Sequence, residues 1–549
     1  MVVGDVKNIS LSSSSFERMI TEGRLYVDKT RMIENFLNHG SEVHLVARQR
    51  RLGKSLNMDM LRCFLTDRTD FRHLFKGLYI ESSSVWGKAN SAPVFYFDFK
   101  TLSVNDYKLE VVSQVYKHIK TVIEPDNLND YLKWKFDNLM KNPDGAEKGL
   151  LLLTEIVYEV TGKRSYLLID EYDKLLLDNY GTGKYKEIKA FETALLSAAL
   201  KGNQYLEKAL LTGVMRISHE SMLSGLNNIV AFDVFNDELY LYDYGLTDNE
   251  MKSLSKLADI NIDDARKWYN GIKIGGYAIY NIYSVMSYLA RGKLECYWGN
   301  SGTMCMIADL LNDNRKASLA KLLNGERVEV GISNRISMSH LSNKTGDQAF
   351  FSFLVQSGYL ALDEDLTNDA TTAVVSIPNT ELMVVWKRFI LEALYANTPR
   401  IKTMFDNADN LTQFAKDLEY LLSDSLSYHD LASRKKEDTG KAQEQIYHVF
   451  VLGMLSAYDD VHCRRPRSNR ESGDGRYDIW VEKPTANFIF EFKSVTNQKN
   501  LDSKAKEALS QIESKRYGMD ISNMKRLVRV GVAICGKMCK VICDEEGIS

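Results

Sequence analysis

The sequence has no apolar run that approaches the roughly 18 residues a membrane-spanning helix needs. Its first ten residues also lack the basic start and apolar stretch of a secretory signal peptide. The 7 cysteines are scattered, and an odd number argues against a disulfide framework. The net charge of −3 excludes a polycation, so nucleic-acid contacts must come from local basic patches. We expect a protein without a membrane partner, cytoplasmic or, in a eukaryote, nuclear.

With 549 residues, the chain is too long for a single hydrophobic core, and three or four domains are expected. An apolar content of 44% and a charged content of 26% are ordinary for a globular protein. Cys535, Cys539 and Cys543 have a spacing that could suggest a metal site. Because no further Cys or His follows and apolar residues surround them, reduced thiols are the better interpretation.

Short apolar segments alternate with helical patterns in the first half of the chain. The predicted strands cover residues 41–47, 93–99, 165–170 and 208–214. This alternation is typical of an α/β fold whose parallel sheet has both faces covered by helices. From about residue 246 the pattern becomes helical. Residues 350–396 predict a helix, a hairpin and a second helix, a winged-helix-like order, and the polar stretch 429–443 is a predicted linker.

Gly53-Lys54-Ser55 lies between the first predicted strand and an amphipathic helix that begins at Ser55. This is the context of a P-loop, in which loop amides and the helix N-terminus hold phosphates, the lysine adds charge and the hydroxyl ligates Mg²⁺. The glycine that usually stands five residues before Gly53 is Arg48 here. By spacing alone the match is degraded, and an ordinary turn is the competing interpretation.

Asp170 and Glu171 end the third predicted strand, after four apolar residues. In P-loop ATPases an acidic strand end of this kind lies near the phosphates, where the Asp supports Mg²⁺ and the Glu polarises the attacking water. A buried strand with solvated acids at its end is the alternative. Because both elements occur in the right order and each at a strand end, the sequence predicts nucleotide binding, with ATP and Mg²⁺ as cofactors.

Asp478 and Glu491-x-Lys493 form a second group of candidate residues near the C-terminus. Asp478 lies on one predicted strand, and Glu491 and Lys493 end the next one. Since side chains alternate along a strand, Glu491 and Lys493 share a face, and a hairpin places Asp478 opposite them. Two carboxylates make a hard oxygen site for Mg²⁺ or Mn²⁺, and the lysine can orient or deprotonate water. This is the PD-(D/E)XK nuclease constellation.

The chain resembles the AAA-ATPase-like proteins that are fused to a PD-(D/E)XK nuclease domain, a family without a well-established substrate. Nearly all of the chain is covered. The matching segments are Tyr26-Val-Asp-Lys-Thr30, Arg48-Gln-Arg-Arg-Leu-Gly-Lys-Ser55, Ile169-Asp-Glu-Tyr-Asp173, Leu211-Thr-Gly-Val-Met-Arg-Ile-Ser218, Ser224-Gly-Leu-Asn-Asn228, Trp268-Tyr-Asn-Gly271 and Tyr280-Asn281. The family commonly has arginine where Arg48 stands, and Gln49 and Leu52 replace its usual Pro and Phe.

The resemblance implies a role for each matched residue. The nucleotide and Mg²⁺ residues are Gly53, Lys54, Ser55 and Asp170, with Glu171 as the base. Thr212 is a polar sensor, and Arg216, Arg50 or Arg51 meets the γ-phosphate, although a surface or structural pair is the commoner role of such an arginine. ATPases of this broad class often assemble through an arginine supplied in trans, so a homo-oligomer is possible.

Two helices flank the nuclease strands, and the resemblance assigns residues on both. The helix over 505–517 carries Gln511 and Tyr517 near the site, where they and Arg476 are expected to bind nucleic acid. The helix over 444–454 offers Glu444 as a third metal-shell acid. His448 shares a face with Glu444 and is equally a packing histidine. Basic residues stand on both sides of the site, where they either contact phosphates or line a solvated loop. They are Arg464, Arg465, Arg467, Arg470, Arg476, Lys499, Lys504, Lys506, Lys515 and Arg516.

The predicted organisation follows from these motifs: an AAA-like ATPase domain over 1–245, its helical extension over 246–335, a winged-helix-like region over 336–430 and a nuclease domain over 440–549. One hypothesis is a nucleotide-gated nuclease that acts on DNA, or less readily RNA, in defence or genetic conflict, with little sequence specificity. The other is a non-catalytic, ATP-dependent switch that binds nucleic acid or a protein partner. A third hypothesis, a metabolic kinase, has little support, because it gives Asp478, Glu491 and Lys493 no role.

Overall fold

The chain divides into two compact units, which we call unit 1 (Met1–Gly299 with Glu329–Leu382) and unit 2 (Asn300–Val328 with Met383–Ser549). The structure is a computed structural model. It describes residues 2–216, 228–258, 260–298, 307, 310–323, 325–333, 341, 347–363, 371–394, 403–405, 408–427, 451, 464–472, 475–482, 486–515, 526–535 and 538–547.

Unit 1 is built around a five-stranded parallel sheet in the order β4-β5-β6-β3-β7. The strands are β3 (Val43–Ala47), β4 (Val94–Asp98), β5 (Ser165–Asp170), β6 (Leu206–Gly213) and β7 (Ile229–Phe232). Every residue of β3 and β5 is buried, as expected for strands covered on both faces. The predicted parallel sheet is confirmed, and β7 is a fifth strand that the sequence did not reveal. Strand β6 lies between the P-loop strand β3 and the acidic strand β5.

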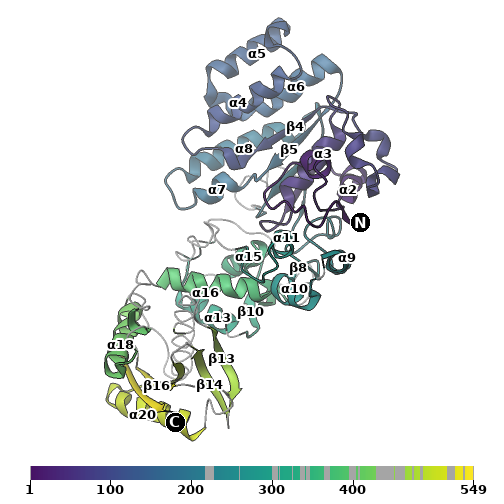
Figure 1. Ribbon diagram of the computed structural model, residues 1–549. Coiled ribbons are helices and arrows are strands. Elements are labelled where there is room, and N and C mark those ends of the chain that lie inside the picture. Colours follow the sequence, from purple (N-terminus) through teal and green to yellow (C-terminus); the bar gives the residue numbers. More distant parts are fainter. Residues whose placement is uncertain are drawn as a thin grey trace. The chain divides into compact units, whose positions relative to one another are not determined.

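Helices cover both faces of this sheet (Figure 1). Helix α3 (Lys54–Leu65) packs on β4, β5 and β6 from one side, and α6 (Gly149–Thr161) and α8 (Tyr185–Leu200) pack on β5 and β6 from the other. Helix α4 (Tyr107–Lys120) packs against α6. The remaining α-helices of this part are α1 (Phe16–Thr21), α2 (Arg31–Asn38), α5 (Asp130–Lys141) and α7 (Lys174–Asp178). The 3-10 helices are η1 (Arg72–Phe75), η2 (Tyr79–Ser82), η3 (Trp86–Lys88), η4 (Phe99–Thr101), η5 (Pro125–Asn127) and η6 (Pro143–Lys148).

The rest of unit 1 has its own hydrophobic core, in which Leu25 and Val27 pack with Trp268, Tyr269 and Tyr280. Its elements are β1 (Val2–Val3), β2 (Tyr26–Val27), α9 (Asp248–Ala258), α10 (Ile262–Tyr269), β8 (Ile272–Ile274), β9 (Tyr277–Ile279), α11 (Ile282–Arg291), β10 (Val328–Gly331), α15 (Gln348–Gln356), β11 (Ala361–Leu362), β12 (Thr372–Ser376) and the start of α16 (Thr380–Leu394). The antiparallel pair β11–β12 between α15 and α16 confirms the predicted order of helix, hairpin and helix. The winged-helix-like assignment itself stays a prediction.

Unit 2 contains a five-stranded sheet in the order β13-β14-β15-β16-β17. The strands are β13 (Arg464–Ser472), β14 (Gly475–Glu482), β15 (Asn487–Ser494), β16 (Arg526–Cys535) and β17 (Met538–Gly547); the helices are α13 (Asp313–Leu323), α18 (Leu411–Ser427), α20 (Leu501–Ser514) and the 3-10 helix η7 (Gln498–Asn500). Only β15 and β16 run parallel, so the sheet is mixed.

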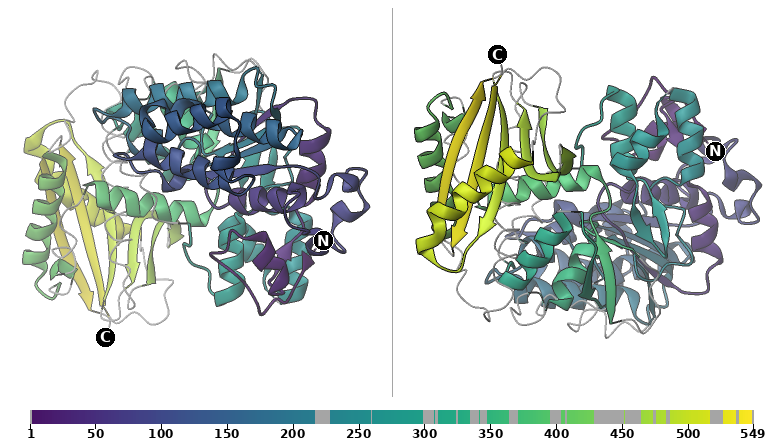
Figure 2. Two further views of the ribbon diagram at one scale, coloured as in Figure 1. Left: turned by 90° about the horizontal axis from the view of Figure 1, so that it is seen from above. Right: turned by 90° about the horizontal axis from the view of Figure 1, so that it is seen from below.

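The alternation of side chains separates the two faces of this sheet. Phe488, Phe490 and Phe492 pack with α18, whereas Ile489 packs with Ile512 of α20. Helices α18 and α20 therefore lie on opposite faces (Figure 2). The same alternation turns Glu491 and Lys493 toward α20.

Several predictions concern segments beyond the described residues. The linker over 429–443 and the helix over 444–454 fall there, apart from the buried Val451. The basic segment from Arg464 to Arg470 belongs to strand β13, which pairs with β14, and is therefore not a loop. Among the described residues, we find no helix with the length and apolar character that crossing a membrane requires.

Candidate functional site: a P-loop and a carboxylate–lysine centre

The loop between β3 and α3 has the backbone geometry of an anion-binding site. Gly53 caps α3 with a φ of 89°, and Arg51 has a φ of 65°. A left-handed φ in a residue other than glycine is strained and persists where the surroundings enforce it. These conformations, together with the free N–H groups of the first turn of α3, present donors to a phosphate, and the helix dipole favours negative charge.

The Lys54 side chain is buried at the start of α3. Its ammonium donates hydrogen bonds to the carbonyl oxygens of Arg48 and Gln49, both at 2.9 Å. Burial lowers the pKa of Lys54, while the carboxylates of Asp170, Glu171 and Asp173 oppose that shift. The lysine thus links the end of the loop back to its beginning through two hydrogen bonds. Its charge also interacts with the carboxylates at and after the end of β5.

Arg48, which stands where a glycine is usual, is a buried structural residue. Its guanidinium forms an ion pair with Asp237 and donates to the carbonyl oxygens of Ala47 at 3.0 Å and Phe232 at 3.1 Å. The ring of Tyr244 lies 5.7 Å away. The arginine therefore points into the protein beside β7, and its side chain leaves the phosphate side of the loop open.

Asp170 ends β5 with its carboxylate held by neighbouring strands. The Thr212 hydroxyl of β6 donates to Oδ1, the Tyr96 hydroxyl of β4 donates to Oδ2 at 3.1 Å, and the backbone N–H of Glu171 donates to Oδ1 at 3.1 Å. Glu171 itself has a left-handed φ of 51°. Three donors fix the orientation of the Asp170 carboxylate, and the strained backbone directs the following glutamate out of the strand.

Tyr172 and Asp173 hold the residues that follow β6, a role the sequence did not reveal. Asp173 Oδ2 accepts hydrogen bonds from the N–H groups of Val214 and Met215, both at 2.8 Å, and the Tyr172 hydroxyl donates to the Met215 carbonyl at 2.7 Å. Burial raises the pKa of Asp173 to about 6. The lack of a side chain at Gly213 permits this contact, because a Cβ there would lie 2.7 Å from the Tyr172 ring.

Of the three arginines predicted to reach the γ-phosphate, Arg216 and Arg51 have different surroundings. Arg216 follows β6, is partly exposed and lies 3.7 Å from the buried carboxylate of Asp233. Arg51 donates to the carbonyl oxygen of Tyr297 and lies 4.2 Å from the ring centre of Tyr283. Arg216 is therefore paired with Asp233, whereas Arg51 is anchored to α11 and the segment after it.

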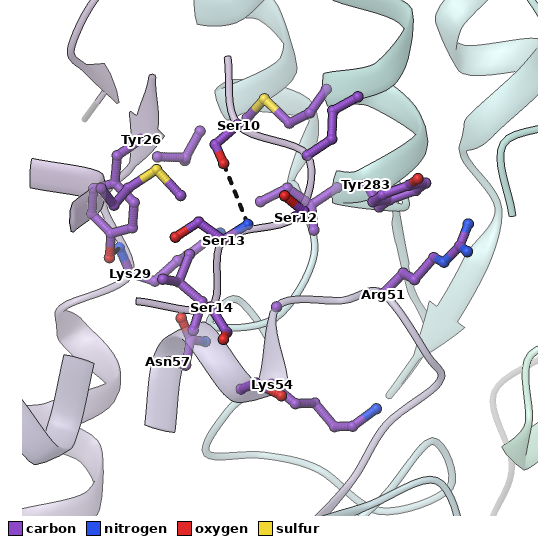
Figure 3. A pocket seen from close by; sticks show the side chains of 18 of the residues that line it. Ser10, Ser12, Ser13, Ser14, Tyr26, Lys29, Arg51, Lys54, Asn57 and Tyr283 are labelled. Atoms are coloured by element: carbon purple, nitrogen blue, oxygen red, sulfur yellow. Dashed lines mark hydrogen bonds between the residues drawn. The ribbon is translucent and has the colours of Figure 1, made fainter. Parts of the chain in front are cut away.

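A pocket of about 270 Å³ adjoins the P-loop (Figure 3). Its lining brings together residues 10–14 from the N-terminal segment, Tyr26 and Lys29, the start of α3, and Ile282, Tyr283 and Met286 from α11. Figure 3 shows the serines crossing the pocket, with the Lys54 side chain extending away from them. From the sequence alone, the polar run Ser12–Ser15 predicts the end of a loose N-terminal arm. That expectation is wrong, because Ser15 caps α1 and Ile9 and Leu11 pack on the core.

In unit 2 the predicted hairpin brings Asp478 beside Glu491. Strands β14 and β15 are antiparallel with Ile479 opposite Phe490, and the backbone N–H of Phe492 donates to Asp478 Oδ2 at 2.8 Å. The Lys493 ammonium lies 3.3 Å from Glu491 Oε1. Two carboxylates and a lysine thus lie on β14 and β15, on the face that α20 covers. Carboxylate oxygens are the ligands that a hard divalent cation prefers.

Helix α20 contributes Gln511, whose amide donates to Glu491 Oε1. The helix approaches so closely because Gly531, the β16 neighbour of Glu491, has no side chain. A Cβ at Gly531 would lie 2.4 Å from the carbonyl oxygen of Ala505 and 2.7 Å from the Leu509 nitrogen. Gln511, predicted to contact nucleic acid, is bonded to the Glu491 carboxylate. Gly531 is a residue of the site that the sequence did not reveal.

The structure leaves the other predicted nuclease residues undescribed. Glu444, His448 and Tyr517 lie outside the described residues, as does the side chain of Arg476. Within the described part of the chain, no group of three or more His, Cys, Asp and Glu side chains is arranged to hold a metal ion. Asp478 and Glu491 are the pair that is present, and a third acid at Glu444 stays a prediction.

Gly531→Ala is expected to displace α20 from Glu491. The added methyl group meets backbone atoms, which cannot move aside as a flexible side chain can, and overpacking of this kind costs about 1–3 kcal/mol. We expect a lower melting temperature and slower cleavage by the C-terminal domain. Thermal unfolding and a cleavage assay measure these effects. Gly40→Ala is the control, because a Cβ there has no atom within 4 Å, and equal effects of the two changes would contradict this explanation.

Two family models match the chain, one over the P-loop region and one over the nuclease-like region. Residues 10–223 match the family model described as a predicted AAA-ATPase, and residues 442–544 match the model of the PD-(D/E)XK nuclease superfamily. A curated relative is an uncharacterized protein in the vnfD 5' region of Azotobacter chroococcum mcd 1, 26% identical over 345 residues. The match covers 62% of this chain and 61% of the relative.

The fold and the two sites define a P-loop ATPase-like protein with a nuclease-type second domain. More particularly, the chain is a fusion of a predicted AAA-ATPase domain with a C-terminal PD-(D/E)XK nuclease-superfamily domain. Both domain families point to ATPase and nuclease chemistry, so the resemblance inferred from the motifs is confirmed.

Proposed function

We propose that this protein is an ATP-controlled, Mg²⁺-dependent nuclease that cleaves DNA, or less readily RNA, in defence or genetic conflict. The observation that carries the proposal is the meeting of Asp478, Glu491 and Lys493 on one face of β14 and β15. An ATP-dependent switch without cleavage would not need a lysine beside two adjacent carboxylates.

ATP would bind with its phosphates at the N-terminus of α3 and its base and ribose in the adjoining pocket. The pocket supports this placement because it is continuous with Gly53, Lys54 and Ser55 and offers both apolar walls and serine hydroxyls. Ser55 and Asp170 would hold Mg²⁺, and Thr212 keeps the Asp170 carboxylate in place. Glu171 would orient the attacking water, and Arg216 would reach the γ-phosphate.

In the nuclease centre, Asp478 and Glu491 would hold the divalent cation, which stabilises charge on the phosphodiester. Lys493 would orient or deprotonate the attacking water from its position 3.3 Å from Glu491. Gln511 fixes the rotamer of that glutamate through its hydrogen bond. The basic residues of β13 and α20 would neutralise phosphates without reading bases, so cleavage should be salt-dependent and weakly sequence-specific.

The proposal is tested by incubating the purified protein with linear duplex DNA and Mg²⁺, with and without ATP. We expect products that depend on ATP and vanish when a chelator removes the metal. ATP binding with DNA left intact under every metal and nucleotide condition would instead favour the non-catalytic switch. The mass of the protein in solution, measured with and without ATP, tests whether it forms the proposed homo-oligomer.

A further inference from the structure

Residues at one end of unit 1 connect the P-loop to the places where the chain leaves this unit. The Trp298 indole N–H donates to the carbonyl oxygen of Arg50 at 3.3 Å, and the Arg51 guanidinium donates to the carbonyl oxygen of Tyr297. Tyr297 and Trp298, together with Glu381, which is described next, form what we call the P-loop clamp. The clamp thus has two direct hydrogen bonds to the phosphate-binding loop.

Glu381, in the first turn of α16, joins the other members of the clamp. Its buried carboxylate accepts hydrogen bonds from the N–H groups of Tyr297 at 2.7 Å and Trp298 at 2.8 Å, and from the Ser284 hydroxyl of α11 at 2.8 Å. Burial raises the pKa of Glu381 to about 7, and these donors oppose the rise. A buried carboxyl with three donors holds its neighbours in one arrangement.

The loop is also packed against Gly358, in the segment that follows α15. Gln49 fills the space over Gly358, where a Cβ would lie 2.3 Å from the Gln49 side chain, and the Trp298 ring lies edge-on to Tyr359 at 4.9 Å. Arg50 and Arg51 are therefore bonded to the clamp. Gln49 and Trp298 pack on the neighbouring residues Gly358 and Tyr359, so the loop and the clamp are connected by close packing.

Two motifs that neither active centre uses support this clamp. From the segment Trp268–Gly271, the Asn270 carbonyl accepts from the Asn379 side chain at 2.8 Å, just before α16. In the other motif, Asn281 caps α11 by accepting from the Ser284 N–H at 3.1 Å. The two motifs thus hold α11, which carries Ser284, and α16, which carries Glu381. In this way both motifs support the clamp.

The clamp adjoins two of the points where the chain passes between the units. Trp298 precedes Gly299, the last residue of the first segment of unit 1, and Glu381 precedes Leu382, the last residue of the second segment. Helix α16 then continues through residues 383–394, which belong to unit 2. The clamp residues Trp298 and Glu381 therefore lie directly before two of the covalent connections between the units.

A bound triphosphate would compete with two carbonyl groups of the loop that the clamp contacts. The Lys54 ammonium donates to the carbonyls of Arg48 and Gln49, and a γ-phosphate would compete for that ammonium. The Arg50 carbonyl that Trp298 binds belongs to the same short loop. Phosphate binding and the Trp298 hydrogen bond are thus linked through two or three peptide groups.

We propose that the P-loop clamp transmits nucleotide binding to the connections between unit 1 and unit 2 and so regulates the nuclease domain. This inference rests on the proposed binding of ATP at the P-loop. It requires that the nucleotide distinguish two arrangements of the clamp, since a ligand shifts an equilibrium only by its difference in affinity for the two states.

The test is hydrogen exchange of residues 383–394, measured in the full-length protein with and without a saturating, non-hydrolysable ATP analogue and Mg²⁺. The variant is Trp298→Phe, which removes the hydrogen bond to Arg50 and keeps a ring against Tyr359. The control is Trp134→Phe on α5, whose side chain is 63% exposed. We expect the analogue to change exchange at least about fivefold in the wild type and the control, and less than about twofold in Trp298→Phe.

Glu381→Gln provides a second variant of nearly the same shape, and we expect it to lose the response as well. Unchanged exchange in a wild type that is saturated with the analogue overturns the clamp and leaves ATP binding intact. A full response in both variants also overturns it. If the wild type does not bind the analogue, the proposed nucleotide site fails, and the clamp fails with it.

Discussion

Lys54→Ala should weaken binding of Mg²⁺–ATP by about 30- to 5,000-fold, which corresponds to about 2–5 kcal/mol for loss of one partner of a buried charge pair. The ammonium is buried at the N-terminus of α3 and lies in the field of Asp170 and Glu171, so few water molecules can replace it. Titration calorimetry or a fluorescent ATP analogue measures the change in dissociation constant, and ATP hydrolysis should fall in parallel.

Lys201→Ala is the matched control for this prediction, because Lys201 is an exposed lysine at the end of α8. It should bind ATP as the wild type does. Loss of Lys54 also leaves the carbonyls of Arg48 and Gln49 without that donor, so the folded fraction of the variant must be checked by circular dichroism. A well-folded Lys54→Ala protein with unchanged affinity would place the nucleotide elsewhere.

Lys493→Ala is expected to slow DNA cleavage by about 10²- to 10⁴-fold, the usual contribution of one acid–base group. The ammonium of the lysine lies 3.3 Å from a carboxylate oxygen of Glu491. The measurement is the single-turnover rate of cleavage with Mg²⁺ and ATP in excess. Affinity for DNA should change far less than the rate, because the basic residues around the site stay in place.

Lys416→Ala on α18 is the control for this second prediction, since it removes an exposed lysine from the helix on the opposite face of the same sheet. It should cleave at the wild-type rate. Glu491→Gln should be at least as slow as Lys493→Ala and should also lose the dependence of the rate on metal concentration. If Lys493→Ala cleaves normally while Glu491→Gln does not, the metal site stands and another group activates water.

The motif-bearing elements could be predicted because each has a local signal. Strand β3 and helix α3 flank Gly53, and β5 ends in Asp170, so alternation of apolar strand and helix identified both. In the nuclease domain, the period of two in a strand placed Glu491 and Lys493 on one face. Antiparallel pairing then placed Asp478 beside them, as the contact of Asp478 with Phe492 N–H shows.

Features that depend on distant partners could not be predicted. The burial of Arg48 depends on Asp237 and on the Phe232 carbonyl, more than 180 positions away. Strand β7 is only four residues long and carries no distinctive pattern. The role of Gly531 follows from how closely α20 approaches β16, which residue spacing does not encode.

The prediction for the N-terminal arm failed for a similar reason. Consecutive serines usually indicate an exposed, irregular segment, but here a helix cap at Ser15 and the packing of Leu11 hold the arm against the P-loop. The pocket beside Lys54 therefore includes residues 10–14, which composition alone assigns to solvent.

The most direct test of an ATP-controlled nuclease is a crystal structure with Mg²⁺ and a non-hydrolysable ATP analogue. The account predicts phosphates on the amides of residues 53–55, the base in the pocket lined by residues 10–14 and α11, and a cation held jointly by Asp478 and Glu491. A well-ordered crystal at saturating concentrations, with the analogue away from α3 and no cation between the two carboxylates, would contradict it.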